Sequence, residues 1–135
     1  MHRLCFLIVA VMAGGSTVVS TQARPYNVIM KDVATSFGAL RKSVAAPDFA
    51  TSAEHARRLE RLFKETEDFW TKFKTKDALD AAKGARELSA AIAAAASAKD
   101  AQKLKTSADG LGRFCTTCHD SHRVQMPDKS YRIRP

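Results

Sequence analysis

Apolar residues recur at intervals of three and four along most of the chain, and this spacing constrains the fold more than any other feature. Gly and Pro number only 6 and 4 among 135 residues, so few positions interrupt the pattern. Intervals of three and four place side chains on one face of a helix, whereas a strand needs alternation at every second residue. Each such helix must bury its apolar stripe against a neighbour, and the pattern therefore predicts an all-α fold.

Four segments carry such a stripe. The first is expected to begin near Pro25 and end before Pro47, the second to begin at Thr51 or Ser52, the third to follow Thr75 and the fourth to follow Asp100. The predicted inward residues are Met30, Val33, Phe37, Leu40 and Val44; Ala56, Leu59, Phe63, Thr66, Trp70 and Phe73; Ala78, Ala82, Ala85, Leu88, Ile92 and Ala95; and Ala101, Leu104, Ala108, Leu111, Cys115 and Cys118. Together they predict a helix bundle, and we expect the tail after Arg123 to be short and irregular.

The third segment is unusually rich in alanine, and two explanations remain open. Alanine has the highest helix propensity, so the composition is consistent with helix formation alone. Small side chains would also leave room in the core for a bulky group. Gly110 and Gly112 in the last segment similarly predict either the close approach of another group or a local loosening of the helix.

The first 23 residues have the layout of a secretory signal peptide. A short basic start at residues 1–3 precedes an apolar run at residues 4–13. Thr21 and Ala23 are small residues at the two positions that a signal peptidase reads. The apolar run is shorter than the ~20 residues that span a bilayer. We therefore expect residues 1–23 to be removed on export to the periplasm, leaving a single domain at residues 24–135 without a stable membrane span. An uncleaved anchor or a buried helix is the alternative.

The chain carries a formal charge of +8, and loss of Arg3 with the signal peptide would leave +7. Such a charge favours acidic partner proteins or anionic surfaces, although an ordinary solvated surface explains it equally well. We expect no nucleic-acid partner, because export separates the chain from nucleic acid and no nucleic-acid motif is present.

The run Cys115-Thr116-Thr117-Cys118-His119 carries the most specific chemistry. Residues at i, i+3 and i+4 share a helix face, so two thiols at this spacing can each form a thioether with one vinyl group of the same haem. The next residue, His119, is then directed at the iron. The motif predicts one covalently attached haem c. A disulfide or redox pair would prefer a βαβ context, and a zinc site would need His122 and the distant His55 as further ligands.

The second axial position of the iron has four candidates in the sequence. His122 and Met126 follow His119 closely and are expected on the same side of the haem, while His55 is expected at one end of the bundle. Met30 lies on the inward stripe of the first segment, where its sulfur could reach the opposite face. Methionine is also a common filler of irregular core space, so the pattern alone supports either role.

The chain resembles the class II c-type cytochromes, which comprise cytochrome c′ and its low-spin relatives. The resemblance rests on the C-terminal position of the haem motif, on the run from Cys118 to Arg123, and on the segment from Met30 to Leu40, which is similar to the first helix of the family. Two positions differ: His122 replaces a family tyrosine, and Tyr26 stands where the family often has arginine.

The resemblance implies an antiparallel four-helix bundle with the haem in its core near the C-terminal helix. Cys115 and Cys118 would form the thioethers, and His119 would be the proximal iron ligand. Met30, which stands eight positions before Gly38, would be the distal ligand, and Arg123 would lie near the proximal side of the haem. Such a protein is a periplasmic single-electron carrier for redox partner proteins and not an enzyme, and relatives often form homodimers. The alternative is a five-coordinate haem protein that binds nitric oxide or another small gas, with Met30 packed over an open iron.

Overall fold

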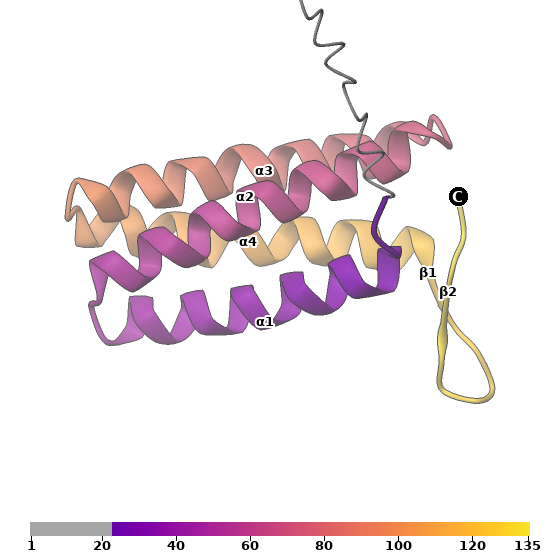
Figure 1. Ribbon diagram of the computed structural model, residues 1–135, viewed down its shortest axis with the longest axis horizontal. Coiled ribbons are helices and arrows are strands. Elements are labelled where there is room, and N and C mark those ends of the chain that lie inside the picture. The colour runs from indigo at the N-terminus through magenta and orange to yellow at the C-terminus, as the bar shows by residue number, and fades with distance from the viewer. Residues whose placement is uncertain (1–22) are drawn as a thin grey trace, which may run out of the picture.

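The computed structural model describes residues 23–135, and nearly all of the expected signal peptide lies outside this part of the chain. Four helices, α1 (Tyr26–Ala45), α2 (Phe49–Thr71), α3 (Lys76–Ser97) and α4 (Ala101–His122), precede two short strands, β1 (Arg123–Gln125) and β2 (Tyr131–Ile133). Each helix runs antiparallel to the one before it, and the four lie side by side (Figure 1). The predicted all-α four-helix bundle is confirmed. Across residues 23–135, no helix is both long enough and apolar enough to cross a membrane.

Aspartates cap two of the helices. The Thr51 backbone N–H donates to Asp48 Oδ1 at 3.0 Å, so α2 begins at Phe49 and not at the predicted Thr51 or Ser52. The Lys103 N–H donates to Asp100 Oδ1 at 2.9 Å, which confirms the predicted start of α4. A carboxylate at this position satisfies N–H groups that the first turn leaves without partners.

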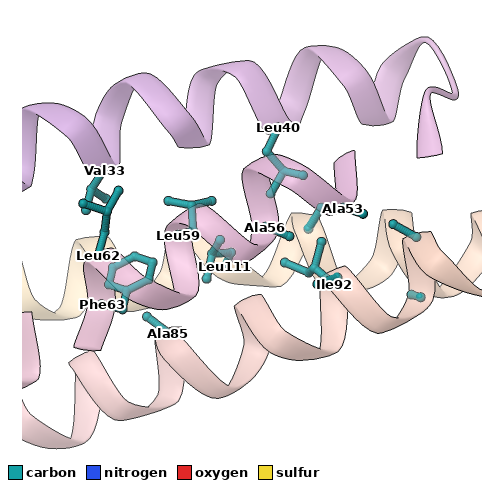
Figure 2. Packing of buried hydrophobic residues seen from close by; sticks show 14 of the residues in the cluster. Val33, Leu40, Ala53, Ala56, Leu59, Leu62, Phe63, Ala85, Ile92 and Leu111 are labelled. Atoms are coloured by element: carbon teal, nitrogen blue, oxygen red, sulfur yellow. The ribbon is translucent and has the colours of Figure 1, made fainter. Parts of the chain in front are cut away.

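The core runs along the bundle axis and is made of the predicted stripes with two differences. Leu40, Leu59, Ile92 and Leu111 are fully buried where the helices meet (Figure 2). In α1, the predicted Val33 and Leu40 are buried, and the other buried residues are Ile29, Ser36 and Ser43, each one position before a predicted residue. Met30, Phe37 and Val44 are partly buried beside it, whereas Ala101 and Phe73 are exposed.

The C-terminal tail is an ordered β-hairpin, which corrects the expectation of an irregular segment. β1 pairs antiparallel with β2, with Arg123 opposite Ile133. The Arg134 N–H donates to the His122 carbonyl at 2.9 Å, and His122 Nδ1 hydrogen-bonds the Arg134 carbonyl at 2.8 Å. These bonds join residues twelve apart, which helical periodicity does not detect.

Candidate functional site

A cavity of about 250 Å³ opens between the four helices near the hairpin end of the bundle. Its walls include Met30 of α1 together with Cys115, Cys118 and His119 of α4. The remaining lining is almost entirely apolar and consists of Tyr26, Val33, Ala34, Phe37, Phe63, Thr66, Ala81, Ala82, Ala85, Gly112 and Phe114. The four residues predicted to carry the chemistry are therefore brought to one cavity, although Met30 lies far from the others in the sequence.

The alanines of α3 divide between the two halves of the bundle. Ala81, Ala82 and Ala85 line the cavity. Ala93 and Ala96 lie near the other end of α3, where they are buried in the hydrophobic core. In the first half of α3, small side chains leave open space, and in the second half they allow close packing of helices.

Gly84 and Phe114 shape one wall of the cavity, although no pattern in the sequence pointed to either residue. A Cβ atom added to Gly84 would lie 2.4 Å from Cε1 of the Phe114 ring, far closer than van der Waals contact. The absence of a side chain at Gly84 therefore lets the Phe114 ring lie against α3. Cβ atoms at Gly110 and Gly112 would meet only ordinary contacts at 3.5 and 3.9 Å, so neither glycine is sterically required.

The two thiols face the cavity in their neutral form. Cys115 and Cys118 are half-buried, and both sulfurs are free of disulfide bonds. Burial, followed by the nearby Asp77 carboxylate, raises the pKa of Cys118 to about 11, and burial also raises the pKa of Cys115. Two neutral thiols side by side on a cavity wall are available for modification by a bound group.

The His119 imidazole is held in its neutral form as well. Burial and the Arg123 guanidinium lower its pKa, against a smaller opposing effect of Asp120. A neutral imidazole retains the nitrogen lone pair that coordinates metals, which a protonated ring lacks.

An aromatic cluster closes the cavity toward the end of the bundle. Trp70 is almost completely buried, and its indole N–H donates to the Tyr26 hydroxyl at 3.0 Å. Burial raises the pKa of Tyr26 to about 12, and the hydrogen bond from Trp70 opposes this in part. The sequence predicted that Trp70 faces inward, but it gave no sign of the hydrogen bond to Tyr26, because 44 residues separate the two.

His122 is a structural residue of this end of the bundle. Its Nε2 pairs with Asp77 Oδ2 at 3.0 Å and its Nδ1 bonds the hairpin at Arg134, so both ring nitrogens are engaged. His55 lies in the first turns of α2, at the opposite end of the bundle from His119. Over the described part of the chain, no three His, Cys, Asp or Glu side chains gather as a metal site. The zinc alternative would need His55 beside the thiols, and His55 lies at the other end of the bundle.

A second, more polar hollow of about 510 Å³ lies on the outer side of the motif, between α4 and the hairpin. It shares Cys115 and His119 with the cavity, and Arg123 and Tyr131 form its far wall. The Arg123 guanidinium carbon lies 3.9 Å from the centroid of the Tyr131 ring, which fixes the arginine at this wall. Met126 lies in the hairpin turn and lines neither the cavity nor this hollow.

The residues fit a covalently held haem. Two thiols and an imidazole at i, i+3 and i+4 supply the donors that such a haem needs on one side, and the Met30 thioether is an established type of ligand for the other. The cavity of about 250 Å³ adjoins the polar hollow at Cys115 and His119, which line both. Apolar walls suit a macrocycle, and the polar hollow at Arg123 suits its carboxylate groups.

Comparisons of the chain with protein-family models, with curated proteins and with solved structures found no match. The resemblance to class II c-type cytochromes therefore continues to rest on the motif, on the first-helix residues and on the helix order. The geometry of the cavity is an independent observation that bears on the same function.

Proposed function

We propose that the protein is an exported single-electron carrier, a class II c-type cytochrome with one haem attached to Cys115 and Cys118. The observation that carries the proposal is the meeting of Met30 with the Cys-x-x-Cys-His motif on the walls of one apolar cavity. A buried methionine and a cysteine pair each have ordinary explanations by themselves. Their convergence on one apolar cavity favours a shared cofactor.

Each residue has a distinct role in this proposal. Cys115 and Cys118 anchor the cofactor, each adding its S–H across one vinyl group. The neutral imidazole of His119 and the sulfur of Met30 would be the protein's two ligands to the iron. The bound haem supplies an iron that gains and loses one electron. The apolar walls exclude water and, with the Met/His ligand pair, favour a raised reduction potential.

A gas-binding protein with an open iron is the second candidate, and the apolar surroundings of Met30 are the observation that favours it. Val33, Phe37 and Phe114 line the cavity together with Met30 and offer no hydrogen bonds to a ligand. Such a wall would also admit a small neutral gas such as nitric oxide. The two candidates share the fold, the attachment residues and His119, and they differ only in whether Met30 binds the iron.

The visible absorption spectrum of the periplasmically matured protein separates the two candidates. The electron-carrier proposal predicts a low-spin spectrum, a weak far-red band from methionine bound to ferric iron, and no change on adding carbon monoxide. Met30→Leu should convert the protein to a high-spin form that binds carbon monoxide and should lower its potential. Met126→Leu, in the hairpin turn, is the matched control and should change nothing. A wild-type spectrum that shifts with carbon monoxide would replace electron transfer by gas binding.

A further inference from the structure

We propose that the hairpin end of the bundle, formed by the α2–α3 loop at residues 72–75 and the tail at residues 123–135, is the surface on which the protein docks an acidic electron-exchange partner. This inference rests on the proposed electron-carrier function. Three independent observations coincide at this end: the distribution of charge, the placement of exposed apolar side chains, and the position of the cavity.

The loop and the tail at this end carry a net positive charge, unlike the connections at the other end. The α2–α3 loop contributes Lys72 and Lys74, and the tail contributes four basic residues against the single Asp128, for a net charge of +5. The connections at the opposite end, residues 46–48 and 98–100, carry Asp48, Lys99 and Asp100, for a net charge of −1. Five of the seven net positive charges expected of residues 24–135 therefore lie in two segments at one end.

These charges differ from those on the sides of the bundle. Along the helices, lysines pair with acids one turn away, as in Lys83 with Glu87 and Lys105 with Asp109. Within residues 23–135, neither Lys72 nor Lys74 belongs to an ion pair with a side chain. Four helix lysines are thus partly neutralised by acids one turn away, whereas Lys72 and Lys74 keep uncompensated charges that can attract an acidic surface.

The exposed apolar side chains lie at the same end. In the described part of the chain, the large apolar residues with high exposure are Val28, Phe73 and Tyr131, at 40%, 45% and 54%. Val28 is in the first turn of α1, Phe73 follows the end of α2, and Tyr131 begins β2, all at the hairpin end (Figure 1). Aromatic residues are enriched in protein interfaces relative to the rest of the surface.

A chain of aromatic contacts joins this surface to the cavity. Tyr26, on the cavity wall, stacks on Phe69 with ring centroids 4.0 Å apart. Phe69 in turn contacts the exposed Phe73 at 5.2 Å. The cavity wall is therefore two ring contacts from solvent at this end. Toward the other end, eight residues of α1, about 12 Å, follow the lining residue Phe37 before the helix ends at Ala45.

The three observations favour an acidic protein over an anionic membrane. The apolar residues come from three separate elements and do not form the continuous amphipathic face that inserts into lipid. Asp128 and Asp120 also lie among the basic residues and would be repelled by a uniformly negative surface. In the exchange itself, one electron passes between this protein and a one-electron acceptor or donor centre in the partner. One centre is oxidised as the other is reduced, and no proton is transferred.

Charge reversal with matched controls tests the proposal. Lys74 and Lys99 are both exposed loop lysines with φ of 56°, at opposite ends of the bundle. Lys72 and Lys42 are exposed lysines at the C-terminal ends of α2 and α1. Lys72→Glu/Lys74→Glu therefore has a close counterpart in Lys42→Glu/Lys99→Glu, with the same change in net charge and the same backbone conformation at the loop position.

The first measurement is the rate at which the reduced holoprotein transfers one electron to hexacyanoferrate(III), a small anion, at low ionic strength. We expect Lys72→Glu/Lys74→Glu to slow this reaction about tenfold, because steering by local charge is lost. The counterpart pair should change it little, and the difference should vanish in high salt. Equal slowing by both pairs would mean that only net charge matters, and no slowing by either would mean that electrons leave elsewhere. Both outcomes overturn the proposal.

The second measurement is binding and does not depend on electron transfer. A 15N-labelled holoprotein titrated with a glutamate-rich peptide should show amide shifts confined to residues 72–75 and 123–135, and the Lys72→Glu/Lys74→Glu variant should lose them. Tight binding to vesicles containing anionic lipid, without localised binding of the peptide, would replace the protein partner by a membrane and overturn the proposal. If the matured chain carries no haem, the proposed electron-carrier function is rejected, and this is known before either experiment is begun.

Discussion

The two ends of the bundle are built from the same four helices but packed differently. One end, here called the loop end, is formed by the connections at residues 46–48 and 98–100. There Leu40, Ile92 and Leu104 are buried together with small residues, and the hydroxyls of Ser43 and Ser52 form a hydrogen bond at 2.8 Å. At the hairpin end, the helices surround a cavity of about 250 Å³, and Tyr26 on its wall packs against Phe69 and Trp70. The loop end has a continuous core, whereas the hairpin end has space for a ligand.

This difference indicates where stability and function reside. Close packing at the loop end supplies the dispersion and hydrophobic terms that hold four helices together. A cavity forgoes part of those terms, so it is maintained at a cost that a bound cofactor can offset. The core extends through both halves of the bundle, but only the half near the hairpin encloses a cavity of this kind.

The largest expected effect compares two substitutions in α1. Leu40→Ala should lower the free energy of unfolding by about 2–5 kcal/mol, because Leu40 is fully buried in the loop-end core. Met30→Ala should cost less than half as much, since Met30 already borders open space. Both are measured by urea unfolding in a Cys115→Ala/Cys118→Ala background, so that no cofactor contributes. Equal losses would contradict the proposed division between the two ends.

A pH-dependent effect is expected next, at Tyr26. The pKa of its phenol is raised to about 12 in the folded protein, so between pH 10 and 12 the unfolded chain releases a proton that the folded chain keeps. The stability that this provides, about 2–3 kcal/mol, is complete below pH 10 and is lost as the pH rises toward 12. Tyr26→Phe should remove this decline.

At neutral pH, Tyr26→Phe should also cost about 1–3 kcal/mol, because the buried Trp70 N–H loses its acceptor. Urea unfolding of both proteins at pH 7, 10 and 11.5 provides the comparison. Parallel curves for wild type and variant over this range would show that Tyr26 does not titrate as described.

A smaller effect is expected from His122, which fastens the hairpin to α3 and α4. His122→Ala removes its bonds to Asp77 and to the Arg134 carbonyl, and should free the hairpin while leaving the helices folded. The amide of Arg134, which donates to residue 122, should lose its protection from hydrogen exchange. His55→Ala at the loop end is the control and should leave that amide unchanged. Continued protection in His122→Ala would mean that strand pairing alone holds the hairpin.

The smallest effect on stability is expected at Gly84. Gly84→Ala gains up to about 1 kcal/mol of helix propensity but drives the new Cβ into the Phe114 ring, which must move toward the cavity. We expect little net change in the free energy of unfolding, together with an altered absorption spectrum of the matured protein. Gly38→Ala, where nothing lies within 4 Å, should only stabilise. An unaltered spectrum in Gly84→Ala would show that Phe114 does not border the cofactor.

Helical periodicity predicted the four helices and most of their buried residues, because that signal is local and repeats along each element. It also placed Met30, Cys115 and Cys118 on inward faces, where the structure has them at the cavity wall. The hairpin and the Tyr26–Trp70 pair were missed, because they depend on contacts between distant residues. The use of Asp48 as the cap of α2 was missed, because Thr51 and Ser52 are equally good capping residues and only the fold decides which is used.

The most direct test of the account is the intact mass of the chain after expression in a bacterium that matures c-type cytochromes in its periplasm. We predict a polypeptide that starts at Arg24 and carries the added mass of one haem, which remains bound after denaturation and disappears in Cys115→Ala/Cys118→Ala. An unmodified mass, or one lighter by the two hydrogens of a disulfide, from cells that do load a control cytochrome would contradict the central claim.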